Sequence, residues 1–131
     1  MTMETTTDLR WPVNPKNGEH YIGIKHDRDG KPESHLVIVA INNSELDWHK
    51  NHVWATTMGA ELSTIFDLRF IRAHRSDLLK RGMWWAADVH CKNSDFSFAL
   101  DTFTGTERLR RKSEVGFGVA VRRVLISAVD R

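Results

Sequence analysis

Residues 35–41, HLVIVAI, constrain the fold of this chain more than any other stretch. Every residue after the histidine is apolar, whereas a strand with one face in water alternates apolar and polar residues. A short apolar run bounded by turn residues is typical of a strand buried on both faces. We therefore predict a central strand at 35–41, and 131 residues are enough to enclose it in a core without metals or disulfides.

A hairpin is predicted around this strand. Residues 20–26, HYIGIKH, form a second run rich in strand-forming residues, and the separator DRDGKPES at 27–34 is dense in Asp, Gly, Pro and Ser. Two such runs joined by turn residues indicate antiparallel partners with a long loop between them.

Two helices are predicted after the hairpin. The first lies within 44–59, where Ser44 or Asp47 can cap its start and Gly59 can end it. The second starts at Thr64–Asp67, whose spacing matches a capping box with Asp in place of the usual Glu. Helical spacing turns one stripe of each helix toward the core, namely Val53, Trp54, Thr57 and Met58 in the first helix and Phe66, Phe70 and Ile71 in the second.

The remainder of the chain has the pattern of strands and turns. The runs are MWWAADVHC from residue 83, DFSFALDTF from 95, ERLRRK from 107 and FGVAVRRVLISAV from 117. Phe96, Phe98 and Leu100 alternate with small or polar residues, which indicates a half-buried strand. The order predicts an α+β domain in which two consecutive helices pack on one side of a mostly antiparallel sheet that ends in a C-terminal β-meander.

One domain is expected, at residues 19–131. Residues 1–18 are polar, and WPVNPKNG concentrates prolines and a glycine there. We therefore predict a loosely ordered N-terminal arm at 1–18, with Trp11 holding it against the domain.

Composition indicates a soluble cytoplasmic protein, because hydrophobic residues make up 40% and charged residues 27%. The single cysteine, Cys91, cannot form an internal disulfide, which fits a reducing compartment. The N-terminal residues lack the basic start and apolar stretch of a signal peptide. No run approaches the roughly 18 apolar residues of a membrane span, so no membrane contact is expected.

No set of residues predicts catalysis, and we expect no enzyme. His49 and His52 share a helix face, but C-x-x-C and H-E-x-x-H spacings are absent, so no metal and no cofactor are predicted. His90 and Cys91 are neighbours on a strand and point to opposite faces, which excludes a nucleophile–base pair. We expect Cys91 to be a small buried hydrophobic residue.

Charge is distributed unevenly along the chain. Residues 1–65 hold six Lys and Arg against nine Asp and Glu (−3), whereas residues 66–131 hold thirteen against eight (+5). Much of the surplus lies in RLRRK, residues 108–112. Such a stripe suits an acidic protein surface or the phosphates of a nucleic-acid-bound complex, and the alternative is a solvated strand face.

The adjacent pair Trp84 and Trp85 must point to opposite faces of its strand. We predict that Trp85 fills the core and that Trp84 lies at the surface. Trp and Arg are enriched at interface hot spots. The predicted binding surface therefore consists of Trp84, Phe103, Arg108, Arg110, Arg111 and Lys112.

Four segments resemble a known family: HLVIVAINNSELDWHKNHVWATTMGAELST, WWAADVH, FSFALDTFTGT and VGFGVAVRRV. Their order and spacing are similar to the phage and prophage branch of the C-terminal domain of Legionella collagen-like adhesins. The resemblance covers about residues 20 to 127. It matches Gly59, Glu61, Leu62 and Thr64 to a GGELPT junction, Trp85 to a strand tryptophan, and Val121, Arg122 and Arg123 to the closing strand; Ser63, Ala86 and Ala87 depart from the family pattern.

The resemblance implies a C-type-lectin-like fold and a binding function. Together with the absence of a catalytic set, it predicts a non-catalytic phage- or prophage-encoded protein that recognises a protein or ligand, with its partner in the bacterial host or the phage particle. The alternative is an inhibitor that binds a bacterial host defence complex directly, in the manner of anti-CRISPR proteins.

Overall fold

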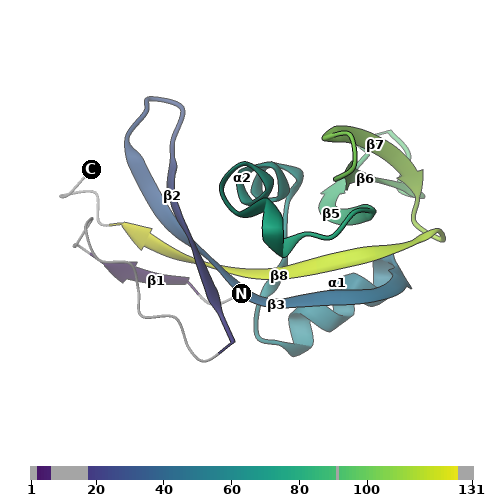
Figure 1. Ribbon diagram of the computed structural model, residues 1–131, viewed down its shortest axis with the longest axis horizontal. Coiled ribbons are helices and arrows are strands. Elements are labelled where there is room, and N and C mark those ends of the chain that lie inside the picture. Colours follow the sequence, from purple (N-terminus) through teal and green to yellow (C-terminus); the bar gives the residue numbers. More distant parts are fainter. Residues whose placement is uncertain (1–2, 7–17, 91, 127–131) are drawn as a thin grey trace.

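The computed structural model describes residues 3–6, 18–90 and 92–126, which form eight strands, two α-helices and one 3-10 helix (Figure 1). In chain order these are β1 (Met3–Thr6), β2 (His20–His26), β3 (Pro32–Asp47), α1 (Trp48–Thr57), β4 (Glu61–Leu62), α2 (Ile65–Arg75), η1 (Ser76–Leu78), β5 (Met83–Val89), β6 (Phe96–Asp101), β7 (Thr106–Arg111) and β8 (Val115–Ile126). The strands join in one mixed sheet, so the domain is α+β, as predicted.

Strand β8 lies at the centre of this sheet. The strand order is β2-β3-β8-β5-β6-β7, and β1 and β4 also pair with β8. The predicted C-terminal meander is right for β5, β6 and β7, which are antiparallel neighbours. It is wrong for β8, which crosses to the middle and runs antiparallel to β3 but parallel to β5. The reason is burial: residues 116–122 are all buried, which the outer edge of a meander could not provide.

The predicted hairpin is present, since β2 pairs antiparallel with β3. Its loop is held by Asp27, whose Oδ1 accepts hydrogen bonds from the backbone N–H groups of Asp29 (2.9 Å) and Lys31 (3.0 Å). Leu36 and Ile38 pack in one core cluster, and Val37 between them is also fully buried. The prediction of a strand buried on both faces is therefore confirmed for residues 35–38, whereas residues 39–41 are only partly buried.

Both helices start where their capping residues predict. Helix α1 follows Asp47, whose side chain accepts a hydrogen bond from the N–H of Lys50 at 2.8 Å. Helix α2 follows Thr64, and the capping box is complete because Thr64 Oγ1 accepts from Asp67 N–H (3.1 Å) while Asp67 Oδ2 accepts from Thr64 N–H (2.9 Å). Gly59 ends the first helical segment at φ +69°, a conformation that glycine adopts without steric cost.

The two helices cover opposite faces of the sheet, which corrects the prediction that they share one side (Figure 1). Neighbouring strand residues point to opposite faces, so β5, β6 and β8 supply both clusters alternately. The α2 cluster contains Leu36, Ile38, Leu68, Ile71, Trp84, Leu100, Val119 and Val121. The α1 cluster contains Trp48, Ala55, Leu62, Trp85, Ala99 and Ala120. Strand β6 is consequently covered on both faces rather than half-buried, since Ser97 and Ala99 are buried as well.

The inward stripe predicted for α1 is wrong for Val53, Thr57 and Met58, and right only for Trp54, which is partly buried against the α1 cluster. Val53 and Met58 are 56% and 46% exposed, and Ala55 and Asn51 lie buried instead. Asn51 takes the inner position because its amide donates to the carbonyl of Gly116 in β8 (3.0 Å). The same amide donates to the carbonyls of Leu46 and Asp47, which directly precede α1. A polar side chain with buried backbone partners thus sets the rotation of this helix.

The stripe predicted for α2 is only partly right. Ile71 is buried and Phe70 is partly buried, but Phe66 is 60% exposed and Leu68 occupies the core. Asp67 turns inward to its ion-pair partners, so the preceding Phe66 points outward.

The predicted N-terminal arm lies mostly outside the described residues. Within it, Met3–Thr6 form β1, which pairs in parallel with residues 123–126 of β8. Residues 1–2 and 7–17, which include Trp11, are not described, and neither is Cys91. No helix in the described ranges is long and apolar enough to cross a membrane.

Candidate functional site

Both tryptophans of β5 are fully buried, which corrects the prediction that Trp84 is a surface residue. The Trp84 ring packs 5.2 Å from that of Phe117, and its Nε1 donates to the carbonyl of Lys80 at 2.9 Å. Trp85 lies in the α1 cluster, so its assignment to the core is confirmed. Because one helix covers each face of β5, neither the Trp84 ring nor the Trp85 ring is accessible to a ligand.

The predicted basic stretch does not form one surface, because β7 alternates its side chains. Arg108 and Arg110 pair with Ala99 and Ser97 and therefore share the face of Trp85, whereas Arg111 pairs with Phe96 on the other face. All four cations are also engaged, Arg108 through an ion pair with Asp101 at 3.6 Å. Arg110 binds Glu114 Oε2 (2.7 Å) and stacks 5.3 Å from Trp85, Arg111 lies 5.1 Å from the ring of Phe96, and Lys112 lies 4.1 Å from that of Trp48.

Phe103, in the turn between β6 and β7, is the predicted residue that stays prominent at the surface. Its side chain is 65% exposed, the largest value among the exposed large hydrophobic residues of the described ranges. The guanidinium carbon of Arg81 lies 5.0 Å from the ring centroid. On the turn itself, Arg72 of α2 donates from Nε to the carbonyl of Thr102 at 3.4 Å. We call Arg72, Arg81, Phe103 and the turn 102–105 the turn surface.

Gly105 allows Arg72 to lie against the turn. A Cβ at this position would come 2.7 Å from Nη1 and 2.9 Å from Cζ of Arg72, and the glycine has φ +77°. Any other residue would both strain the backbone and push the guanidinium away.

The turn is rigidly tied to the loop before β5. Thr102 Oγ1 accepts from Gly82 N–H (3.0 Å) and donates to the carbonyl of Lys80 (2.8 Å), while the backbone N–H of Thr102 donates to the carbonyl of Gly82 (3.0 Å). Asp101 holds the other side, since its Oδ1 accepts from Phe103 N–H at 3.0 Å. These bonds fix Phe103 relative to Arg81.

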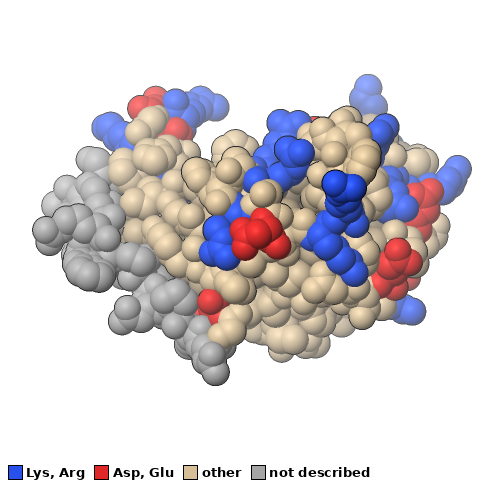
Figure 2. Space-filling model, in the orientation of Figure 1, with Lys and Arg blue, Asp and Glu red and all other residues tan. Residues whose placement is uncertain are grey.

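Two ion pairs flank the turn surface. Arg69 Nη2 lies 2.8 Å from Glu107 Oε1 on the sheet face covered by α2. Arg108 Nη2 lies 3.6 Å from Asp101 Oδ2 on the other face of the sheet. Figure 2 shows Lys and Arg side chains gathered over α2 and toward β5 to β7, with acidic side chains between them. By contrast, neither Arg72 nor Arg81 forms an ion pair with a carboxylate in the described part of the chain.

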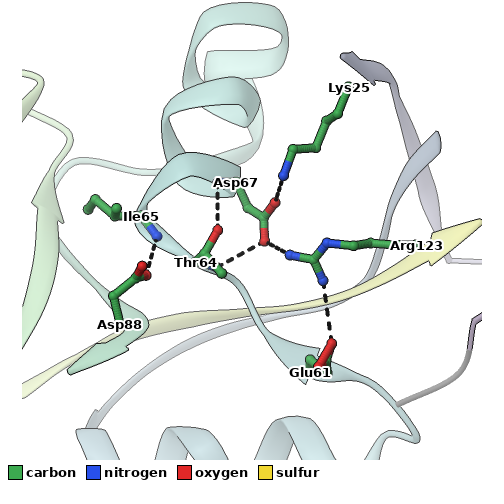
Figure 3. Close-up of polar contacts among 7 residues, drawn as sticks. All are labelled: Lys25, Glu61, Thr64, Ile65, Asp67, Asp88 and Arg123. Atoms are coloured by element: carbon green, nitrogen blue, oxygen red, sulfur yellow. Dashed lines mark hydrogen bonds and ion pairs between the residues drawn. The ribbon is translucent and has the colours of Figure 1, made fainter. Parts of the chain in front are cut away.

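A second charged group lies at the start of α2 and is structural (Figure 3). Asp67 is fully buried, and its Oδ1 binds Lys25 Nζ at 2.6 Å while its Oδ2 binds the guanidinium of Arg123. Arg123 also lies 3.4 Å from Glu61 Oε2. Two cations and two carboxylates therefore neutralise one another between β2, β4, α2 and β8.

The start of α2 is closed to an external anion, because carboxylates already occupy it. The N–H of Ile65 donates to Asp88 Oδ1 at 2.7 Å, and Asp67 completes the capping box. A cavity of about 420 Å³ opens beside this network, lined by His52, Thr56, Ala60, Glu61, Leu62, Thr64, Ala87 and Arg123. Its carboxylate is paired with Arg123, the His52 ring packs 5.1 Å from that of Trp48, and Thr56 Oγ1 donates to the carbonyl of His52 at 3.1 Å.

The titration of described groups follows local contacts. The hydrogen bond from Arg75 lowers the pKa of Asp77, and the same contact raises the pKa of Arg75. Burial raises the pKa of Tyr21, whose hydroxyl lies 2.9 Å from His35 Nδ1. In the ranges 3–6, 18–90 and 92–126, no group of three or more His, Cys, Asp or Glu could hold a metal ion.

The predicted binding surface includes Phe103 but neither Arg72 nor Arg81, which the fold brings to the same turn. The available signal was the T-G turn at 104–105, which brings β7 back beside β6. No protein-family model matches this chain, and a search of curated proteins finds no match. The likeness to the adhesin domain thus stays a prediction.

Proposed function

We propose that this chain is a non-catalytic binding protein that recognises a protein partner through the turn surface. The observation that carries the proposal is the exposed ring of Phe103, with Arg81 against it and Arg72 on the same turn, neither arginine being paired with a carboxylate in the described residues. Aromatic residues and arginine are the types enriched at interface hot spots. The buried charges of the Asp67 network, in contrast, satisfy one another.

The proposal places the protein in the bacterial cytoplasm as a phage or prophage product with a C-type-lectin-like fold. This part rests on the resemblance of four sequence segments to the adhesin-domain family. The α+β order of a hairpin, two helices and later strands is compatible with it. A ligand or receptor in the host or on the phage particle would then be the partner.

The alternative is inhibition of a bacterial host defence complex by direct binding. An exposed aromatic residue beside two arginines that pair with no carboxylate of the described ranges favours it, because such a surface suits docking on a protein complex rather than on a small neutral ligand. A glycan array separates the two functions, since an adhesin-like protein binds a glycan and a defence inhibitor does not.

The test of the proposed function is affinity capture from a bacterial lysate with the wild-type protein and a double charge reversal, Arg72→Glu with Arg81→Glu. We expect the reversal to abolish capture of the specific partner. The matched control is Arg28→Glu with Lys31→Glu, which changes the net charge equally on the exposed β2–β3 loop. Equal capture by all three proteins would refute binding through the turn surface.

A further inference from the structure

We infer that the turn surface docks on an acidic protein surface in which an apolar pocket lies between carboxylates. Phe103 would fill the pocket, and Arg72 and Arg81 would each bind a carboxylate. This inference rests on the proposed function, because it names the chemistry of the partner at the same surface.

The apolar part follows from the position of Phe103. A ring that is 65% exposed leaves most of its apolar area in water, and burying such an area drives association. The tip of the β6–β7 turn can enter a concave site without displacing either neighbouring strand. The partner must therefore supply an apolar hollow rather than a flat polar face.

The charged part follows from the two arginines. A guanidinium binds a carboxylate through two parallel N–H···O bonds, and such charge-assisted pairs are stronger than neutral hydrogen bonds. Arg72 is placed by Thr102 and Gly105, and Arg81 is placed by Phe103, so both are oriented before a partner arrives. Less side-chain freedom is then lost on binding.

The flanking ion pairs favour a protein over a nucleic acid. A phosphate backbone is bound by a continuous track of cations, whereas Asp101 and Glu107 interrupt the arginines around this turn. A protein surface carries charges of both signs and can match this alternation, because its own basic residues can pair with Asp101 and Glu107 at the rim.

Two pools of synthetic peptides of equal length test the inference directly. In one pool Asp and Glu flank Leu, Ile and Phe, and in the other Asn and Gln replace the acids. A single-stranded oligonucleotide is the third probe. Binding is measured by fluorescence anisotropy across a salt series, and the contact residues are identified by NMR chemical shifts of the isotope-labelled full chain.

We expect the acidic pool to bind with shift changes at residues 72, 81 and 102–105, and the amide pool to bind at least about tenfold more weakly. Phe103→Ala should weaken binding about thirtyfold, the effect of an interface hot spot. Arg72→Lys with Arg81→Lys keeps the charge but removes the planar fork, so it should weaken binding less than the double reversal to Glu. The control Arg28→Glu with Lys31→Glu should bind as the wild type does.

Tighter binding of the oligonucleotide at the same residues would overturn the acidic-protein partner while leaving the proposed binding function intact. Failure of every probe at the turn surface, with lysate capture still lost in the double reversal, would also overturn the partner chemistry alone. Capture that does not depend on Arg72 and Arg81 would overturn both. Circular dichroism of each variant confirms that the fold is kept.

Discussion

Replacing Asp67 by Asn removes one negative charge from a fully buried side chain and leaves its size almost unchanged. Two cations then lose their shared partner, because Asp67 binds both Lys25 and Arg123. The amide oxygen can still accept one hydrogen bond, so the capping box of α2 is weakened rather than abolished. The substitution therefore tests the charge of the network more than its shape.

The magnitude follows from the exposure of the two cations. Removing one partner of a buried ion pair costs about 3–5 kcal/mol of the free energy of unfolding. The Lys25 and Arg123 side chains keep 15% and 16% exposure, and Arg123 keeps Glu61 at 3.4 Å, so part of the loss is recovered. We expect a loss of about 3 kcal/mol, near the low end of that range. At about 4 °C per kcal/mol for a domain of this size, the melting temperature falls by about 12 °C.

Thermal and urea unfolding, followed by tryptophan fluorescence and circular dichroism, measure this loss. The matched control is Asp77→Asn, which removes a carboxylate from an exposed pair with Arg75 at 2.9 Å and should leave the melting temperature nearly unchanged. A double-mutant cycle with Lys25→Met should show a coupling of about 1–2 kcal/mol. If Asp67→Asn melts within about 2 °C of the wild type, the network does not stabilise the fold.

Three further predictions concern packing and titration. Gly118→Ala should cost about 2–4 kcal/mol in urea unfolding, because a Cβ there would clash with Oδ1 of Asn51, a side chain held by buried hydrogen bonds. A neutral result would show that α1 can shift. Trp84→Ala should cost about 3–5 kcal/mol in the same assay, whereas Phe103→Ala should stay within about 0.5 kcal/mol; equal effects would contradict the assigned burial. Burial raises the pKa of Tyr21, the chain's single tyrosine, above its ordinary value of 10.0. The unfolded chain therefore loses its phenolic proton first, and the free energy of unfolding falls as pH rises past about 10. Ultraviolet absorbance titration should show the folded protein ionising at higher pH than the unfolded chain, and coincident titrations would refute the assignment.

Local signals predicted local structure well. The caps at Asp47 and Thr64, and the hairpin loop at Asp27, depend on side chains within four residues of their partners, so sequence spacing is sufficient to find them. The same holds for residues 35–38 of the apolar run, because its composition reports its buried environment directly.

The positions of the helices could not be predicted in this way. An apolar stripe at Val53 and Met58 has the spacing of a core face, but the rotation of α1 is set by Asn51 and its bond to Gly116, 65 residues away. The burial of Trp84 depends on α2 covering the face that α1 does not. The turn surface was missed for the same reason, since Arg72 reaches the carbonyl of Thr102 and Arg81 reaches the ring of Phe103 only after α2 and β6 are packed together.

The central place of β8 has a consequence for how the chain folds during synthesis. β8 follows every other described strand in the sequence, yet β3, β4, β5 and β1 all pair with it. Ser34 must find Leu125, and Asp47 must find Val115, so the contacts that close the sheet span most of the domain. Proteins dominated by such distant pairings fold slowly, on the order of milliseconds to seconds. Until residues 115–126 leave the ribosome, β3 and β5 have unpaired edges, and a nascent chain stalled before that point presents them to aggregation and to chaperones.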